Sequence, residues 1–556
     1  MFKKMLIMAI TILLFSPHLC SVFAKNSNSL EVITYTISLK GQALNVRIDC
    51  PAGSNEPSVF GISDWAGIEN FSDNIYHVEA SSASNDRLKI AKPYSNRWVV
   101  NNDGKAFSLQ YVLRSSKSNF IGIDEEDSFQ PTFLKNLTFL WGYSVFLTPA
   151  NDYLRSFPVR LIIDNETETK LFSSLPEEKT FKSISHLTNS MFVAGDLRCH
   201  TAQVLGVPVE FYLSGMKWQF SDAEFISVMK RIISNQARAM GSYPVDKMMI
   251  VLLEGSEESS GGTVVKDAIA LYPSPDKGPI AGNESLLTLV AHENFHLWNG
   301  SSELFPESSH KEGYYKWFQE GFTEYFTAVT LLKEGLITRR RFSEKINKLL
   351  RNYYTNPLSK TASIEDIAQN YWSSDNYKNL PYNKGAIIAF IFDHAIQHFS
   401  NRKMSITNYF RSLLKIMKQY PNGYDIKVLR QTFLELTDES AGEIFDECVF
   451  GVKELPLKKA GQMFSFPVEE KIEAMFDLGF EYDEPKLKSG VKVKRVSAFS
   501  AAEKAGLKAG DVLTGVDIYY GDPSKKVRFN IDRDGEKIDI GYYPKKEMAI
   551  LQLKLD

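Results

Sequence analysis

The stretch His292-Glu293-Asn294-Phe295-His296 places two histidines four residues apart, with a glutamate directly after the first. Residues four apart lie on one face of an α-helix, so both imidazoles can reach a single ion. The flanks favour a helix, because Asn283 offers a cap before the stretch and Gly300 offers a stop after it. The stretch therefore predicts a helix over 284–298 that carries a metal site.

A catalytic zinc site needs a third protein ligand and an open position for water. The best candidate is Glu320, in the segment Trp-Phe-Gln-Glu-Gly-Phe-Thr at 317–323. This segment opens a predicted helix over 314–333, whose apolar residues leave Glu320 on a different face. The alternatives have no predicted helix to hold them; they are Glu303, Glu307 and His310.

The residue types at this site indicate hydrolysis. Zinc lowers the pKa of a bound water and polarises a substrate carbonyl. Glu293 directly follows the first histidine, so we expect it to take the proton of the zinc's water as general base and to pass it to the leaving amine. The alternative is a pair of solvent-facing histidines beside a glutamate that forms a helical ion pair.

Two motifs resemble those of the glycyl aminopeptidase family of zinc metallopeptidases, which is of the gluzincin type. They are His292-Glu293-x-x-His296-x-Trp298-Asn299 and Trp317-x-x-Glu320-Gly321-x-Thr323-x-Tyr325. The resemblance implies one Zn²⁺ per chain held by His292, His296 and Glu320. It also implies an N-terminal β domain, a thermolysin-like catalytic domain and a PDZ domain.

Two further segments bear on the substrate. The run Tyr382-Asn383-Lys384-Gly385 resembles a gluzincin segment, and the resemblance implies that the Tyr382 hydroxyl donates to the developing oxyanion. The alternative is that Tyr382 is a core tyrosine. The family's Gly-Gly-Leu-Glu-His strand corresponds here to the run from Gly261 and Gly262 to Val265, and the glycines leave backbone groups open to an extended peptide. Val264 stands where the family has the glutamate that holds a substrate's amino end.

The whole pattern predicts a multidomain α+β chain. Residues 25–180 alternate in strand fashion and predict a β-sandwich-like domain. Residues 181–460 combine a small β portion with long helices and form the expected thermolysin-like, mainly α-helical catalytic domain. Residues 461–556 are short-stranded, and their Ala505-Gly506-Leu507 and Gly510-Asp511 segments resemble a PDZ domain.

The first 24 residues are typical of a signal peptide, with Lys3 and Lys4 before a short apolar run. We therefore expect export, to the periplasm or the extracellular side, and no transmembrane segment after cleavage. The formal net charge of −3 gives no basic surplus that would favour nucleic acid as a partner.

The expected partner is a peptide or protein substrate, and a C-terminal peptide is a second possible partner. Backbone amides around Leu478-Gly479-Phe480 could receive its carboxylate, unless the PDZ-like fold only packs on the catalytic domain. The leading hypothesis is an exported zinc metallopeptidase, with an aminopeptidase as one form of it. One alternative is a catalytically weak peptide-binding protein whose zinc is structural, and another is a zinc hydrolase of a non-peptide bond.

Overall fold

The computed structural model describes residues 31–554 apart from 66–67, 116–128, 166–168, 177–179, 216–217, 256–260, 275–277, 301–311, 418, 420–424 and 483–486. The predicted signal peptide lies outside the described residues, as do Glu303, Glu307 and His310. Among the helices in this part of the chain, none combines the length and the apolar run that crossing a membrane requires.

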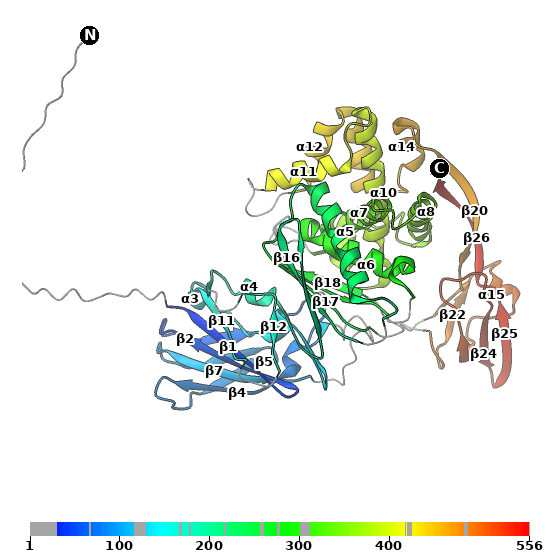
Figure 1. The fold of residues 1–556 in the computed structure, drawn as a ribbon. Coiled ribbons are helices and arrows are strands. Elements are labelled where there is room, and N and C mark those ends of the chain that lie inside the picture. The colour runs from blue at the N-terminus through cyan, green and yellow to red at the C-terminus, as the bar shows by residue number, and fades with distance from the viewer. Residues whose placement is uncertain are drawn as a thin grey trace, which may run out of the picture.

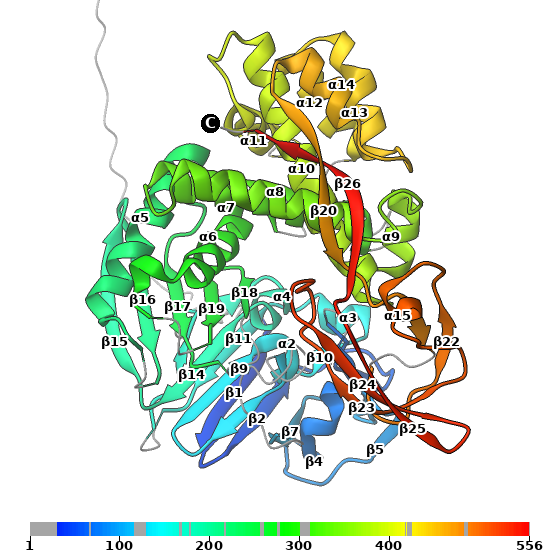
Figure 2. The ribbon, with the colours of Figure 1, turned by 90° about the vertical axis from the view of Figure 1, so that its right-hand side faces the viewer.

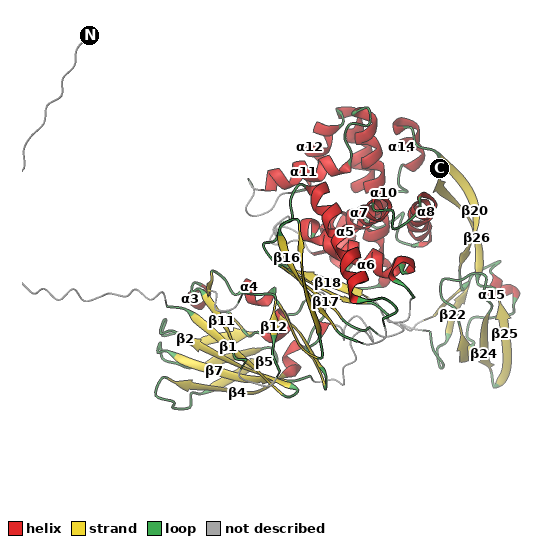
Figure 3. Cartoon of the chain, in the orientation of Figure 1, coloured by secondary structure: helices red, strands yellow, loops and turns green. Residues whose placement is uncertain are grey.

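The N-terminal region is built from three sheets around one apolar core (Figures 1 and 3). The first has the order β13 (Thr180–Phe181), β11 (Val159–Ile163), β1 (Ile33–Lys40), β2 (Ala43–Cys50), β7 (Phe107–Leu113), β4 (Ile75–Ser82). The second is β10 (Thr148–Pro149), β3 (Ser58–Gly61), β6 (Arg97–Val100), β5 (Ile90–Tyr94). The third is β12 (Phe172–Ser173), β14 (Met191–Gly195), β9 (Leu137–Trp141), β8 (Thr132–Leu134). Burial alternates along β1, as a strand with one core-facing side requires.

A five-stranded sheet follows and lies between the N-terminal core and two helices. Its order is β15 (Arg198–Val204), β16 (Val207–Leu213), β17 (Met248–Leu252), β19 (Ala268–Tyr272), β18 (Gly261–Val265). In β17, Met249 and Val251 join the N-terminal core, whereas Met248 and Ile250 pack under helices α5 (Asp222–Met240) and α6 (Glu284–Asn299). The sheet is therefore covered on both faces, and β18 forms its edge.

Helices make up the next layer (Figures 2 and 3). They are α7 (Phe322–Lys333), α8 (Arg339–Thr355), α9 (Ile364–Asn370), α10 (Asp375–Phe399), α11 (Ile406–Met417), α12 (Ile426–Leu436), α13 (Gly442–Val449) and α14 (Leu457–Phe464). The short helices elsewhere are η1 (Phe71–Asn74), α2 (Gly142–Val145), α3 (Asp152–Arg155), α4 (Ser185–Thr188), η2 (Ile280–Gly282) and η5 (Glu439–Ala441). A large aromatic core holds the layer together around α10, which is buried along most of its length.

Two helices differ from their predicted form. The segment predicted as one helix over 314–333 is a 3₁₀ turn, η3 (Glu312–Tyr315), then a π-helical turn, η4 (Trp317–Gly321), then α7. The apolar pattern of residues 384–399 predicts a helix that starts only at Lys384, whereas helix α10 begins at Asp375, although Pro381 lies inside it. Proline removes one backbone donor and usually ends a helix, so the sequence pattern placed Tyr382 before the helix rather than within it.

The C-terminal region has its own small core beyond a long two-stranded ribbon. The ribbon pairs β20 (Val468–Phe476) with β26 (Lys545–Leu553), so the last strand returns to the helical layer (Figure 2). The remaining elements surround the small core: β21 (Phe480–Tyr482), β22 (Val493–Val496), α15 (Ala501–Lys504), β23 (Val512–Asp517), β24 (Val527–Arg533) and β25 (Glu536–Tyr542). The predicted fold class, a multidomain chain with a β-rich N-terminal region, a helical catalytic region and a PDZ-like C-terminal region, is confirmed.

Candidate metal centre

Helix α6 presents the two histidines on one face. The Asn283 side chain caps the helix by accepting a hydrogen bond from the Leu286 backbone N–H at 3.0 Å. Leu286, Leu287 and Val290 are buried under the five-stranded sheet and fix the rotation of the helix. The opposite side of the helix therefore directs His292 and His296 toward η4.

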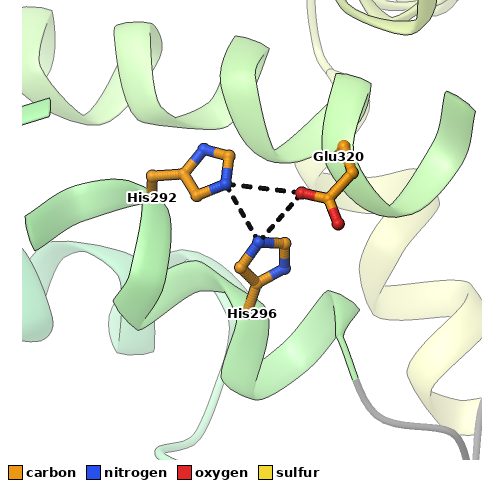
Figure 4. Close-up of side chains that lie close together, drawn as sticks. All are labelled: His292, His296 and Glu320. Atoms are coloured by element: carbon orange, nitrogen blue, oxygen red, sulfur yellow. Dashed lines mark hydrogen bonds and ion pairs between the residues drawn. The ribbon is translucent and has the colours of Figure 1, made fainter. Parts of the chain in front are cut away.

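Three side chains converge there on one point (Figure 4). The Nε2 atoms of His292 and His296 lie 3.0 Å apart. Oε2 of Glu320 lies 3.5 Å from Nε2 of His292 and 3.2 Å from Nε2 of His296. Two atoms bound tetrahedrally to one zinc at about 2.0–2.1 Å lie about 3.3 Å apart. The separations and the two-imidazole, one-carboxylate donor set therefore fit zinc.

The π turn η4 positions Glu320, and two close contacts hold η4. A Cβ on Gly385 of α10 would lie 1.9 Å from the carbonyl oxygen of Trp317, and a Cβ on Gly321 would lie 2.3 Å from Cα of Gly385. The Asn299 side-chain amide, at the end of α6, donates to the backbone oxygens of Phe318 at 2.9 Å and Gln319 at 3.0 Å. The end of the histidine helix is thus tied directly to the turn that carries Glu320.

Two charged residues beside the cluster were missed by the sequence analysis. Oε1 of Glu324 lies 3.1 Å from Nδ1 of His292, at ion-pair distance from the protonated ring. Nζ of Lys316 donates to Oε1 of Glu320 at 3.1 Å. Both residues stand four positions from Glu320, and this helical spacing was the available signal.

These contacts shift the ionisation of the cluster. Burial alone would raise the pKa of Glu320, but Lys316 and the two histidines hold it well below its usual range. Burial alone would lower the pKa of His292, but hydrogen bonding to Glu320 and Glu324 raises it well above its usual value. The cluster is therefore a buried set of strongly coupled charges. A bound cation would compensate the buried carboxylate charge and so lower the cost of burying it.

Glu293 lies between the cluster and the edge strand β18. Its side chain fills the space that a Cβ on Gly262 would need, since that atom would lie 2.7 Å from Cγ of Glu293. Burial raises the pKa of Glu293, and the neighbouring histidines oppose the rise. Gly262 thus allows a carboxylate to sit between the strand and the metal ligands, while Gly261 lies farther along the same strand, against the ring of Tyr272.

Tyr382 approaches the cluster from α10. Its ring is nearly parallel to that of His292, with the centroids 6.2 Å apart and an interplanar angle of 13°. Burial and the charge of Glu320 raise the pKa of Tyr382 well above its usual value, so its hydroxyl keeps its proton at neutral pH. The hydroxyl is therefore able to donate a hydrogen bond at this edge of the cluster.

Comparisons with known proteins agree with this architecture. The family model of the M61 glycyl aminopeptidases matches residues 285–388, the model of the peptidase M61 N-terminal domain matches residues 34–197, and a PDZ domain model matches residues 470–518. No curated protein matches the chain.

One solved structure shares the fold at low sequence identity, and two others give weaker matches. The crystal structure of an aminopeptidase N family protein from Idiomarina loihiensis superposes with a TM-score of 0.72 at 18% identity, covering 94% of this chain and 98% of that one. An M1 zinc metallopeptidase from Deinococcus radiodurans gives a TM-score of 0.47 at 14% identity, covering 77% and 95%. Legionella pneumophila aminopeptidase A in complex with aspartic acid gives 0.47 at 15% identity, covering 94% and 58%.

The fold and the family models together define a metallopeptidase with a β-rich N-terminal domain and a PDZ domain. Two of these models, over residues 34–197 and 285–388, are those of the M61 glycyl aminopeptidase family, so both regions of the chain are similar to that family.

Proposed function

We propose that this protein is an exported zinc metallopeptidase that hydrolyses peptide bonds at the cluster of His292, His296 and Glu320. The convergence of three ligand atoms at 3.0, 3.2 and 3.5 Å carries the proposal. A bound Zn²⁺ would supply a Lewis acid that acidifies a water and polarises the substrate carbonyl. Export rests on the signal-peptide pattern of residues 1–24.

The proton steps are assigned to this chain's own side chains. Glu293, buried against Gly262, takes the proton of the attacking water and delivers it to the leaving amine. Tyr382 donates its hydroxyl proton in a hydrogen bond to the oxygen of the scissile carbonyl as negative charge develops there. The edge strand β18 offers backbone groups at Gly261 and Gly262 to an extended substrate.

The test separates metal binding from chemistry. Wild-type protein loaded with zinc and desalted should hold about one equivalent, and His296→Ala should hold none. Glu293→Gln should keep the metal and lose about 10²–10⁴-fold in kcat/KM on a peptide library read by mass spectrometry. His398→Ala, at the end of α10, is the matched control and should change neither quantity. Wild-type protein that binds no zinc, or Glu293→Gln with unchanged turnover, would overturn the proposal.

The C-terminal domain has a narrower proposed role. The backbone N–H of Gly479, which a peptide's C-terminal carboxylate would use, already donates to Oδ1 of Asp477 at 2.7 Å. A C-terminal peptide must therefore displace Asp477, and we expect Asp477→Ala to bind such peptides more tightly than the wild type does. Calorimetric titration of both proteins with peptides ending in a free acid or an amide checks this. If the variant and the wild type bound the free-acid peptides with equal affinity, the proposed role would be wrong, and the domain would serve only to pack on the rest of the protein.

A further inference from the structure

A polar cavity of about 740 Å³ lies beside the candidate metal centre. Its lining residues lie on helices α6, α7, α8 and α10, and those of α8 are called here its outer wall. Helix α8 runs across α6 and α7 in Figure 2. Two lining residues connect it to the centre: Tyr382, whose ring is parallel to that of His292, and Glu324, which contacts Nδ1 of His292. Tyr382 is the proposed contact of the scissile carbonyl, and it also lines the cavity, so a substrate group next to the scissile bond lies beside the cavity.

The cavity carries one unmatched positive charge. Its outer wall bears Arg341, Lys345 and Lys348, whereas its carboxylates are Glu284 and Glu324. Glu284 pairs with Arg341 at 2.8 Å and with Lys345 at 3.1 Å, and Glu324 is held by His292. Across the described ranges, Lys348 has no ion-pair or hydrogen-bond partner for its side chain.

The remaining lining is suited to oxygen ligands rather than to an apolar side chain. Ligand cavities in proteins are usually lined mainly by apolar residues. Here the aliphatic side chains that line the wall are Ala328 and Leu349, and most of the others are carboxamides and hydroxyls such as Asn352, Asn379 and Thr288. Amide N–H groups around an unpaired ammonium favour a carboxylate.

On the described part of the edge strand β18, one position that could have carried the opposite charge is apolar. Val264, at the position where the resemblance leads us to expect a glutamate that holds an amino end, lies opposite Ile269 on β19 and packs against the core beneath α6. Its side chain offers no charge to an ammonium group. Among the described residues, Lys348 therefore offers a charged contact to a substrate carboxylate, whereas Val264 offers none to a substrate ammonium group.

We propose that this cavity binds a carboxylate of the substrate next to the scissile bond, with Lys348 as its charged contact, so that the enzyme prefers acidic peptides. The inference rests on the proposed peptidase function. The carboxylate has two sources, an aspartate or glutamate side chain and the free C-terminus of a short peptide. Both would be held by the same ammonium and amide groups.

The experiment compares matched acid and amide substrates. N-acetylated and free peptides carry Glu or Gln on either side of the cleaved bond, and a second set ends in a free acid or an amide. In one of these pairs, the wild-type protein should cleave the substrate with the carboxylate about tenfold better in kcat/KM than its uncharged counterpart. One charge-assisted hydrogen bond accounts for a difference of this size. The pair that shows the preference identifies the source of the carboxylate. Lys348→Gln should bring the ratio near one, and Lys348→Glu should invert it.

A control and a second readout keep the outcomes separate. Arg339→Gln removes a positive charge from an exposed site on the same helix outside the cavity, and should keep the wild-type ratio. Binding of the same peptides to zinc-loaded Glu293→Gln protein is measured by calorimetry. Absence of turnover in the wild type would sink the peptidase proposal, whereas the binding ratio would still test the cavity. Equal binding of acid and amide, or a preference that survives Lys348→Glu, would overturn the inference.

Discussion

The His292 ring has a carboxylate on each side, Glu320 at Nε2 and Glu324 at Nδ1, and both contacts bear on how the ring would bind a metal. Its Nε2 atom faces Glu320, while its Nδ1 atom lies 3.1 Å from Glu324, which is itself buried to about three quarters of its side chain. A carboxylate behind a ligating imidazole fixes the ring orientation and raises the basicity of the nitrogen that binds the metal. Glu324 is thus a positioning residue rather than a ligand.

Glu324→Ala should therefore weaken zinc binding by about 10–100-fold, because His292 loses the partner that orients it. Competition titration with a zinc-binding dye measures this affinity. Glu435→Ala, on an exposed face of α12, serves as the control and should bind zinc like the wild type. An unchanged affinity in Glu324→Ala would mean that the ring is oriented by its packing alone.

The site residues that could be predicted from the sequence are those whose spacing fits one face of a helix. His292, Glu293 and His296 follow from helical periodicity alone, because their positions relative to one another need no tertiary information. Lys316 and Glu324 were missed because a lysine and a glutamate four residues from another glutamate are common on exposed helices. Their contribution depends on the burial of η4 and α7, which only the packed structure provides.

At the scale of elements, the centre depends on the crossing of η4 over α10. The π turn gives an extra residue in the helical ladder and thereby directs Glu320 toward α6. The turn lies so close to α10 that Gly321 and Gly385 contact each other through their backbones. The sequence predicted an uninterrupted helix over 314–333, because a π turn has no distinct periodic pattern over so few residues.

Gly385→Ala should separate these two elements. The new methyl group would meet the carbonyl oxygen of Trp317 at 1.9 Å, so η4 must move away and carry Glu320 with it. We expect the free energy of unfolding to fall by about 1–3 kcal/mol and the zinc content to fall as well. Denaturant titration and metal analysis check the two effects.

The matched control is Gly282→Ala, since a Cβ at Gly282 would have no neighbouring atom within 4 Å. This variant should keep both stability and metal. If Gly385→Ala lost stability but retained a full equivalent of zinc, the crossing would matter for folding and not for the position of Glu320.

At the scale of the whole molecule, the two ends of the C-terminal region belong to different cores. Strands β21 to β25 surround a small core of their own, whereas the end of β26 returns to the helical layer. Ile550, Leu551 and Leu553 are part of the same apolar cluster as α10. The ribbon is also fastened to α8, since Arg351 pairs with Glu473 at 2.7 Å. The Asn347 side chain of α8 also donates to the Leu553 backbone oxygen at 2.9 Å and accepts from its N–H at 2.8 Å, so both strands of the ribbon brace the helix that forms the outer wall of the cavity.

This return of the chain could not be predicted from local patterns. The predicted boundary at residue 460 rests on a change from helical to short-stranded composition, and it stays a prediction. The β-rich, helical and PDZ-like regions each have a recognisable pattern, so the fold class was predictable. Strand β26 pairs with β20 across the whole small C-terminal core and also belongs to the apolar cluster around α10, more than a hundred residues earlier, and a period of two gives no information about such contacts.

Ile550→Ala tests whether the last strand supports the catalytic region. The Ile550 side chain is fully buried in the helical core, so its truncation should cost about 2–5 kcal/mol in the unfolding of that region. Ile472→Ala is the matched control, because Ile472 lies on the other strand of the same ribbon with 73% of its surface exposed, and should cost about 0.5 kcal/mol or less. Guanidinium titration followed by tryptophan fluorescence measures both variants. Equal and small losses would mean that the ribbon only rests on the helical layer, whereas a loss confined to Ile550→Ala would show that the C-terminal strand completes the core behind the metal centre.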